Sequence, residues 1–427
     1  MRSTPIRTAV AVVGIAGLAL AVGGCAANPS NGVTTLNFFQ YKGEALGDFA
    51  AIIDEFEAEN PDIRVVQNQV ADSETAIRTL LVKDRAPDVI TLNGNGNYGT
   101  LAKAGVFADF SDDAVLDRVS PAVQDILADL GNAEGEVNGL GYVSNANGVI
   151  YNTEIFAQQG LEVPETWDEF IAVCEALQAA GITPFASSLA DSWTVMPSFN
   201  AIGAYAAQDG FFDEMRAQGE DVDADSPVSF SKDYADTLAK EAELFPYSQD
   251  GYRGATYDDA TALFANGGAA MMLQGIWALS PVKNVNPDIP AAIFPYPVPE
   301  NPDDRVLVSG VDIVVTMGEH TPHRDEAIRF IEFMFEKDVI ERFAASQNMF
   351  PAATDAEISD DPALQSVAPY VEDGRIAGFI DHQVPTSIPL VGVVQQAMFD
   401  GDLAGSLSTL DNEWRKVAAR TIPVSED

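Results

Sequence analysis

Aromatic, amide and carboxylate side chains gather at the ends of predicted strands in this chain. Aromatic faces stack on the C–H-rich side of a sugar ring, while amides and carboxylates bind its hydroxyl groups. Burial in the core is the alternative for each aromatic ring. The mixture favours a binding site for a neutral carbohydrate, and the candidate residues are Tyr41, Glu44, Asn93, Asn95, Asn145, Trp193, Gln274 and Trp277.

An acidic loop imitates part of a calcium-binding motif. Asp221, Asp223 and Asp225 have the spacing of the first three ligands of such a loop. Ser226 stands where the turn needs glycine, and Lys232 stands where the metal needs a bidentate glutamate. The chain has 3 histidines and no spare cysteine for a dense zinc cluster. We therefore predict no metal site and no cofactor.

Residues 94–99 match the GxGxxG pattern of dinucleotide-binding loops. The pattern follows a predicted strand and opens a helix, where glycines let backbone N–H groups approach a pyrophosphate. However, it follows the third strand rather than the first, and no acidic residue clearly ends the next strand. We therefore expect no dinucleotide there, although the carboxyl end of a strand is still the place where an α/β sheet receives a ligand.

Catalytic motifs are weak. The chain has 65 acidic residues, so a carboxylate pair for glycoside hydrolysis can be drawn almost anywhere and carries little information. The sequence contains neither the GxSxG elbow nor the P-loop. Cys174 lies in an apolar helical run and is expected to be buried rather than catalytic. We predict a binding protein without enzymatic activity, and an exported glycoside hydrolase is the alternative.

Composition and charge exclude some classes of function. The formal net charge is −42, from 65 acidic and 23 basic residues. This excess repels nucleic-acid phosphates and anionic lipid, so we predict neither a nucleic-acid binder nor a polybasic membrane-surface protein. With 427 residues, 47% hydrophobic and 21% charged, the chain has globular composition and is long enough for two or three domains.

The N-terminus has the pattern of an export signal. Arg2 and Arg7 precede an apolar stretch that is too short to span a bilayer comfortably. Val22-Gly23-Gly24-Cys25 then resembles the lipobox of bacterial lipoproteins, whose cysteine is lipidated after cleavage. We predict a signal peptide over 1–24, a tether over 25–34, and an extracytoplasmic protein anchored to the outer face of the cell membrane by lipidated Cys25. An ordinary secretory signal with an incidental cysteine is the alternative.

Predicted strands and helices alternate along the chain. This alternation is typical of parallel βαβ units, and hence of an α/β fold whose sheets are covered on both faces. The predicted strands are 36–39, 64–70, 87–92, 270–273, 291–294 and 311–315. The predicted helices are 46–60, 75–83, 166–181, 234–244, 257–265, 324–335, 390–399 and 403–419, the third of which begins with a capping box, Thr166 to Glu169.

Several short motifs occur in a characteristic order. They are residues 56–65 (FEAENPDIRV), 86–89 (APDV), 104–110 (AGVFADF), 148–152 (GVIYN), 163–170 (VPETWDEF), 264–272 (FANGGAAMM) and Gly275-Ile276-Trp277. Together with the lipobox, they resemble the family 1 extracellular solute-binding proteins, which are the sugar-capturing subunits of ABC importers akin to maltose-binding protein. The resemblance covers nearly the whole mature chain.

This resemblance implies an α/β fold of two lobes, the periplasmic-binding-protein-like fold of type II, in which each lobe is a mostly parallel sheet flanked by helices. It implies an N-terminal lobe of residues 35–141 and 306–349 and a C-terminal lobe of residues 142–305 and 350–427. The ligand would lie in the cleft, with the lobes closing around it at a hinge. The implied partners are a mono- or oligosaccharide and the permease subunits of an ABC importer, and we expect a monomer.

The resemblance also bears on single residues. Asn95 lies where relatives often place a polar sugar ligand, and Asn145 lies where some carry an acid. Trp277 occupies the position of the stacking tryptophan in Gly-x-Trp, Trp193 lies near another aromatic contact, and Asn93 stands where several relatives have an aromatic residue. A binder of a polyamine or of ferric ion is the alternative, but the chain has no Tyr-Tyr pair of the kind that iron sites use.

Overall fold

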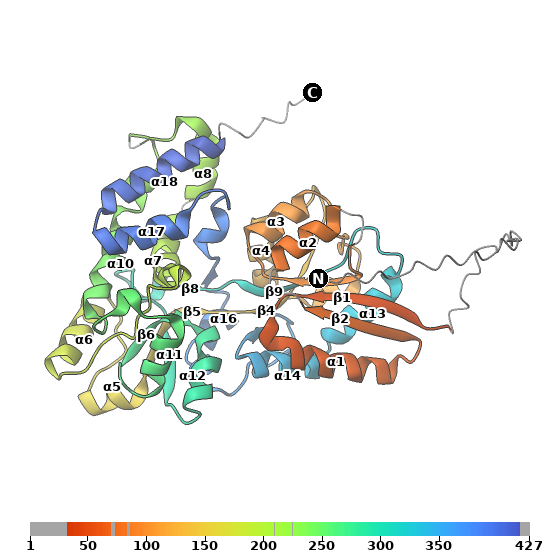
Figure 1. The fold of residues 1–427 in the computed structure, drawn as a ribbon, viewed down its shortest axis with the longest axis horizontal. Helices are drawn as coiled ribbons and strands as arrows, with labels where there is room; N and C mark the ends of the chain where they lie inside the picture. The colour runs from red at the N-terminus through yellow and green to blue at the C-terminus, as the bar shows by residue number, and fades with distance from the viewer. Residues whose placement is uncertain (1–31, 70–72, 83–85, 209, 224, 419–427) are drawn as a thin grey trace, which may run out of the picture.

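The computed structural model describes residues 32–418 except 70–72, 83–85, 209 and 224. Two lobes lie side by side, each with its own β-sheet, and the chain crosses between them (Figure 1). The predicted signal peptide and Cys25 lie outside the described residues. Among the helices that are described, none combines the length and the hydropathy that a membrane span requires.

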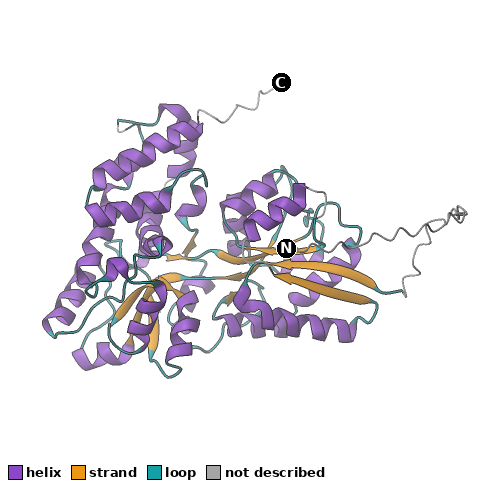
Figure 2. Ribbon diagram, viewed as in Figure 1, coloured by secondary structure: helices purple, strands orange, loops and turns teal. Residues whose placement is uncertain are grey.

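The first lobe contains a six-stranded sheet in the order β10-β4-β9-β3-β1-β2. Helices cover both faces of this sheet (Figure 2). Phe49, Ile52, Ile53 and Phe56 lie at helical spacing and are buried on one face of the first helix, as the sequence predicts. The strands are β1 (Thr34–Gln40), β2 (Ile63–Gln69), β3 (Val89–Leu92), β4 (Leu140–Ser144), β9 (Val311–Thr316) and β10 (Phe350–Pro351). The helices are α1 (Leu46–Glu59), α2 (Ser73–Val82), α3 (Gly96–Lys103), α4 (Pro121–Leu130), α13 (Arg324–Met334) and α14 (Lys337–Gln347).

The second lobe contains a five-stranded sheet in the order β11-β8-β5-β6, with β7 also paired to β5. A separate layer of helices with its own apolar cluster lies at the top left of Figure 1. The strands are β5 (Asn147–Asn152), β6 (Met271–Gly275), β7 (Ala291–Phe294), β8 (Leu307–Val308) and β11 (Ile376–Ala377). The helices are α5 (Thr153–Gln159), α6 (Trp167–Ala179), α7 (Met196–Ala207), α8 (Phe211–Gln218), α9 (Phe230–Asp233), α10 (Ala235–Leu244), α11 (Tyr257–Ala265), α12 (Leu279–Val285), α15 (Pro362–Gln365), α16 (Ala368–Glu372), α17 (Leu390–Asp400) and α18 (Leu403–Ala418).

The expectation of mostly parallel sheets is wrong for the strand pairs of both lobes. In the second lobe β5 is antiparallel to β6, β7 and β8, and only β8 and β11 are parallel. In the first lobe most strands share one direction, but most neighbouring pairs are antiparallel. Strands β1 to β4 run in one direction and β9 and β10 in the other, and three of the five neighbouring pairs are antiparallel. The cause is the connection between the lobes. Strand β4 leads the chain out into β5, and β9 leads it back from β8, so these two neighbouring strands run in opposite directions.

Sheet pairing also moves the expected lobe boundaries. Strand β4 lies wholly in the first sheet, whereas the expected boundary would cut it after residue 141. Strand β8 lies in the second sheet, and β10 lies in the first, which is the reverse of the expected assignment. A short strand carries no local sign of the sheet it will join. We therefore propose crossovers at residues 145–146, at residues 309–310 and after residue 357.

The two local motifs of the sequence have structural roles. The Thr166 hydroxyl accepts a hydrogen bond from the Glu169 backbone N–H at 3.3 Å and caps α6. The Glu169 carboxylate, however, accepts from the backbone of Glu165 at 2.8 Å rather than from Thr166. In the GxGxxG loop, a Cβ at Gly94 would lie 2.6 Å from the carbonyl oxygen of Val311, and one at Gly99 would lie 2.1 Å from that of Leu130. These glycines permit close backbone packing.

Candidate functional site

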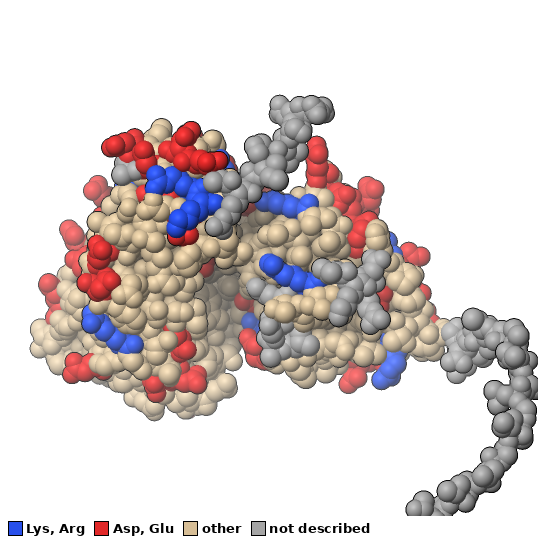
Figure 3. Space-filling view, turned by 45° about the horizontal axis from the view of Figure 1, so that its top comes forward, with Lys and Arg blue, Asp and Glu red and all other residues tan. Residues whose placement is uncertain are grey.

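A cavity of about 310 Å³ lies between the two lobes at the crossovers, and we call it the inner cavity. Figure 3 shows the groove between the lobes in space-filling form. The walls of the inner cavity combine two indole rings with amides, carboxylates and an imidazole. The lining residues are Asn93, Asn145, Trp193, Met196, Pro197, Asn200, Trp277, Asp312, Phe379, Asp381, His382 and Val391.

A second cavity, of about 590 Å³, adjoins the inner one because Trp193 and Trp277 line both, and we call it the outer cavity. Polar residues of the first lobe face aromatic and small residues of the second lobe across it. The lining residues are Lys42, Glu44, Asp48, Trp193, Tyr257, Trp277, Ser280, Pro281, Asn284, Ser346, Gln347 and Met349.

The Trp277 indole is held by its neighbours at the end of β6. Its Nε1–H donates to the Gln274 side-chain oxygen at 3.0 Å, and Gln274 is only 3% exposed. A Cβ at Gly275 would lie 2.2 Å from the Trp277 ring, so only glycine lets this ring fold back over its own strand. The ring of Phe379, which directly precedes the turn of Asp381 and His382, lies 6.3 Å from the indole. The Gly-x-Trp motif thus fixes one aromatic wall of the site.

Trp193 supplies the second indole, from a short 3-10 turn at Ser192–Val195. Its side chain is 41% exposed, which is high for a ring of this size and leaves apolar surface open to the groove. The Tyr257 ring lies 4.9 Å from it at an angle of 58°. The two rings therefore continue the aromatic wall from the inner cavity into the outer one.

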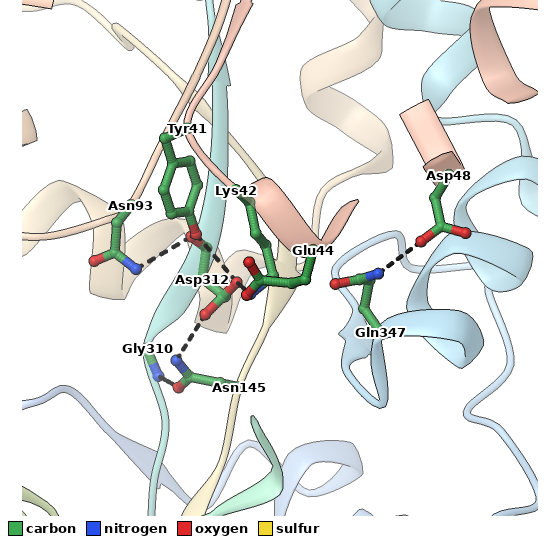
Figure 4. A network of polar contacts seen from close by, with 9 residues as sticks. All are labelled: Tyr41, Lys42, Glu44, Asp48, Asn93, Asn145, Gly310, Asp312 and Gln347. Carbon is green, nitrogen blue, oxygen red and sulfur yellow. Dashed lines mark hydrogen bonds and ion pairs between the residues drawn. The ribbon is translucent and has the colours of Figure 1, made fainter. Parts of the chain in front are cut away.

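Asp312 is the centre of the polar network on the opposite wall (Figure 4). Its Oδ2 accepts from the Lys42 ammonium at 2.8 Å and from the Tyr41 hydroxyl at 3.1 Å. Its Oδ1 accepts from the Asn145 amide at 3.3 Å. Lys42 is 7% exposed and also pairs with the Glu44 carboxylate at 3.1 Å. Asp312 is therefore a buried carboxylate whose charge is compensated by a lysine.

The titration of this network follows from its burial and its charges. Burial by itself lowers the pKa of Lys42, but the carboxylates of Asp312 and Glu44 outweigh burial and raise that pKa. Burial, followed by the charge of Asp312, raises the pKa of the Tyr41 hydroxyl well above its usual value. Lys42 thus stays charged and Tyr41 stays neutral, so the wall presents fixed donors and acceptors.

Asn145 joins two of the crossovers as well as lining the inner cavity. Its backbone N–H donates to the Gly310 carbonyl at 3.0 Å, and its side-chain oxygen accepts from the Gly310 N–H at 3.0 Å. The Ser309 hydroxyl donates to the Asn145 carbonyl at 2.7 Å. Because these contacts use the side-chain oxygen, the amide faces the site mainly through its nitrogen.

The structure divides the eight predicted site residues into two groups. Five line a cavity: Glu44, Asn93, Asn145, Trp193 and Trp277. The other three lie behind the walls of these two cavities. Tyr41 supports Asp312, Gln274 supports Trp277, and the Asn95 side chain caps α3 by accepting from the backbone N–H groups of Asn97 and Tyr98 at 2.9 and 3.2 Å.

Sequence reasoning missed several lining residues. Asp312 could have been suspected, because a carboxylate inside the apolar strand Val311–Thr316 needs a partner. Asp381 and His382 lie in a short turn without periodicity, and no local pattern marks them. Asn200 is buried and accepts from the Asp381 N–H at 3.0 Å, so it positions that turn.

The arrangement is suited to binding rather than to metal chemistry. Two indoles provide stacking faces, and the amides and carboxylates opposite them provide hydrogen-bonding groups in fixed directions. Within the described part of the chain, no group of three or more His, Cys, Asp or Glu residues is placed to hold a metal ion. Cys174 lines neither cavity and is buried, and burial raises the pKa of its thiol, as expected of a residue that packs as an apolar side chain.

Comparisons with known proteins agree on one family. The bacterial extracellular solute-binding protein family matches residues 43–341. The multiple sugar-binding protein of Streptococcus mutans serotype c is 28% identical over 317 residues, which are 72% of this chain and 73% of that protein. The apo form of RafE from Streptococcus pneumoniae superposes with a TM-score of 0.81 at 24% identity, covering 92% of this chain and 100% of that chain.

RafE in complex with raffinose superposes with a TM-score of 0.77 at 24% identity, covering 90% of this chain and 100% of that chain. At this identity the solved structures show a common fold, that of the periplasmic binding proteins. The family match spans well over half of the chain and includes the first two crossovers and the lining residues of the inner cavity up to Asp312. This chain therefore belongs to the bacterial extracellular solute-binding proteins and adopts their two-lobe α/β fold.

Proposed function

We propose that this protein captures a carbohydrate outside the cytoplasm and delivers it to the permease of an ABC importer, without catalytic activity. The observation that carries the proposal is the pair of indoles, Trp193 and Trp277, in an interlobe cavity opposite amides and carboxylates. This combination is what a neutral sugar needs for stacking and for hydrogen bonds to its hydroxyls. The family and its sugar-binding relatives support the same solute class.

The charges around Asp312 disfavour the two rival functions. Asp312 is one candidate carboxylate for glycoside hydrolysis, and its hydrogen bonds to Lys42 and Tyr41 hold it away from acting on a sugar. A polyamine site needs uncompensated acids, whereas the ammonium of Lys42 lines the outer cavity beside Glu44. Incubation with oligosaccharides should yield no shorter products by chromatography. Turnover by purified protein would overturn the binding proposal.

The proposed function includes the location of the protein. A signal peptide over 1–24, a tether over 25–34 and lipidation of Cys25 would keep a monomeric receptor at the outer face of the cell membrane. Expression of the full chain should give a membrane-associated protein whose N-terminal peptide carries a lipid by mass spectrometry. Cys25→Ser should release the protein into the soluble extracytoplasmic fraction. Membrane retention of that variant would contradict the anchor.

A thermal-shift array of mono- and oligosaccharides tests the solute class. A sugar that binds only the folded protein raises its stability by mass action, so a bound sugar raises Tm in a concentration-dependent way. Isothermal titration of each positive sugar should then give a stoichiometry near one. A complete array without any shift, together with a shift caused by polyamines, would replace the carbohydrate proposal.

Substitution of the stacking tryptophan tests the site itself. Trp277→Ala should weaken sugar binding by about 1–3 kcal/mol, because it removes one aromatic face of the inner cavity. Trp167→Ala is the matched control, since Trp167 lies on α6 and lines neither cavity. Titration of both variants after a check of folding by circular dichroism separates the two. Equal affinity of Trp277→Ala and the unsubstituted protein would remove this residue from the site.

A further inference from the structure

Building on the proposed carbohydrate function, we propose that Asp191 is a positioning residue for Trp193. Its carboxylate ties the short turn that carries this indole to the N-terminus of α11, and the contact holds the ring in the orientation on which a sugar stacks. Asp191 lines neither cavity, so it acts on the solute only through the ring. The proposal is carried by the turn itself, by the helix beside it and by the hydrogen bonds that join the two.

The turn that carries Trp193 has little stability of its own. It is a 3-10 helix of four residues, Ser192–Val195, and 3-10 hydrogen bonds have poorer geometry than those of an α-helix. Asp191 stands at its N-cap position, where an aspartate usually accepts a hydrogen bond from its own helix, whereas here the carboxylate bonds elsewhere. The Trp193 ring is 41% exposed, so packing encloses only part of it. The orientation of the indole must therefore be set from outside the turn.

Helix α11 is a firm support beside this turn. Thr256 and Asp259 form a capping box at its N-terminus, in which each residue satisfies the backbone N–H of the other. Further along the helix, Ala260 and Phe264 are buried in the apolar core. The helix is therefore fixed both at its start and along one face, and its first residue, Tyr257, starts from a fixed backbone.

The Asp191 carboxylate joins the turn to this helix. Its Oδ2 accepts a hydrogen bond from the Tyr257 backbone N–H at 2.7 Å. The first N–H groups of a helix have no acceptor inside it, and the positive end of the helix dipole favours a carboxylate there. Hydrogen bonds to an ionised acceptor are also stronger than neutral ones. Directly behind this contact, the Ala190 N–H donates to the Ala255 carbonyl at 3.1 Å and aligns the two loops.

Asp191 is bonded to the turn of Trp193 as well. Its carbonyl oxygen accepts from the Thr194 backbone N–H at 3.1 Å and from the Thr194 hydroxyl at 2.7 Å. One residue thus holds α11 through its side chain and the turn through its backbone. The result is the observed ring pair, in which Trp193 lies 4.9 Å from Tyr257 at an angle of 58°. A sugar that stacks on a ring already held in place orders less of the protein, so its affinity is higher.

Isothermal titration of substituted proteins tests this role, with the best binder among melibiose, raffinose, stachyose and maltotriose as the probe. Asp191→Ala should weaken binding about three- to tenfold, because the indole must then be ordered when the sugar binds. Asp191→Ser should do the same, since serine is a good N-cap residue but its hydroxyl is too short to reach Tyr257. Asp191→Asn should stay within about twofold of the unsubstituted protein, because its amide oxygen accepts from the same N–H.

Two further measurements separate positioning from a general loss of stability. In a Trp193→Ala background, Asp191→Ala should change affinity by less than about twofold, since the ring through which Asp191 acts is gone. In protein labelled with fluorotryptophan, the Trp193 resonance is assigned by its loss in Trp193→Phe. This fluorine resonance should shift or broaden in Asp191→Ala without any sugar present. The resonance of Trp414, a buried indole on α18, should stay unchanged.

Asp109→Ala is the matched control, because Asp109 also accepts from a distant backbone N–H, that of Val137 at 3.0 Å, but lines neither cavity. Its affinity should equal that of the unsubstituted protein. Unchanged affinity in folded Asp191→Ala or Asp191→Ser would overturn the positioning role and leave the carbohydrate function intact. An unchanged Trp193 resonance, or an equal loss of affinity with and without the Trp193 ring, would also overturn it. Absence of binding to every sugar would overturn the proposed function and this role with it.

Discussion

Asp312 shows how a single buried residue organises the site. A carboxylate that is 7% exposed needs an opposite charge and hydrogen-bond donors, and Lys42, Tyr41 and Asn145 provide them. Tyr41 and Lys42 directly follow β1, and Asn145 lies in the first crossover, so the carboxylate on β9 links three segments of the chain. The carboxylate therefore shapes the wall of the inner cavity.

Glu241 is a buried carboxyl that the site does not use. One of its oxygens accepts from the Ser198 hydroxyl on α7 at 2.7 Å, and its other oxygen has no hydrogen-bond partner among the described residues. Burial raises the pKa of this carboxyl from 4.5 to about 8, against the smaller lowering effect of Ser198. Glu241 is thus protonated over most of the physiological pH range.

This raised pKa makes stability depend on pH. Between 4.5 and about 8 the folded state binds the Glu241 proton more tightly than the unfolded chain does. The free energy of unfolding should therefore fall as pH rises through this window, by at most about 1.4 kcal/mol per pH unit, and level off above it. Glu241→Gln should remove this contribution, so that the variant gains stability relative to the unsubstituted protein as pH rises.

Urea unfolding at about pH 5 and about pH 9 measures the difference between the two proteins. Glu175→Gln, an exposed substitution on α6, is the control for loss of a carboxylate without burial. A difference between Glu241→Gln and the unsubstituted protein that does not change with pH would contradict a raised pKa at Glu241.

At the scale of elements, the ends of helices and strands position the site. Asn95, which the sequence predicts to bind the solute, caps a helix in the structure. Its side-chain oxygen caps α3, and this helix begins at the carboxyl end of β3, directly beside the groove. The cap places the backbone of Gly96 close to the second lobe, where a Cβ would lie 3.1 Å from the His382 carbonyl oxygen.

Substitution of this cap separates a structural role from solute binding. Asn95→Ala should lower the free energy of unfolding by about 0.5–2 kcal/mol, because two backbone N–H groups lose their acceptor. Asn95→Asp should recover most of that loss, since aspartate is an equally good cap. Sugar affinity should change little in Asn95→Asp by titration. A large loss of affinity at unchanged stability would show direct contact with the solute.

The turn after β6 positions the stacking ring. Gly275→Ala should displace the Trp277 indole, because the added methyl group would lie 2.2 Å from the ring and 2.3 Å from the Ala146 carbonyl oxygen. Sugar affinity should fall by an amount similar to that of Trp277→Ala, and tryptophan fluorescence should shift. Gly254→Ala is the control, because a methyl group there meets no atom within 4 Å. Unchanged affinity and fluorescence in Gly275→Ala would refute this role.

At the scale of the whole molecule, the crossovers connect the lobes and lie against the inner cavity. Asn145 and Gly310 are joined by one backbone–backbone hydrogen bond and by one from the Gly310 N–H to the Asn145 side-chain oxygen, each 3.0 Å, so the first two crossovers are tied together. A solute that touches both lobes favours the conformation in which both walls contact it. Closure of the groove would then concentrate backbone rotation in these few residues.

Addition of a sugar that binds should therefore compact the protein. The radius of gyration from small-angle X-ray scattering should decrease on saturation, and hydrogen exchange should change at residues 145–146 and 309–310. A sugar without a thermal shift serves as the control and should leave both measurements unchanged. Identical scattering with and without a saturating sugar would contradict closure.

The sequence by itself determined the local elements and part of the site. Helix α1 followed from the spacing of Phe49, Ile52 and Phe56, and Trp277 followed from its Gly-x-Trp motif, because helical periodicity and short motifs are local properties. The tertiary structure alone decided which strands share a sheet. It also placed Asp312 and Asp381 beside Asn93 in the lining of the inner cavity. These residues are separated by more than 200 positions along the chain from Asn93, and no local pattern records such contacts. Pairing of β9 with β3 brings Asp312 to Asn93, and packing of the two lobes brings Asp381 to the same cavity.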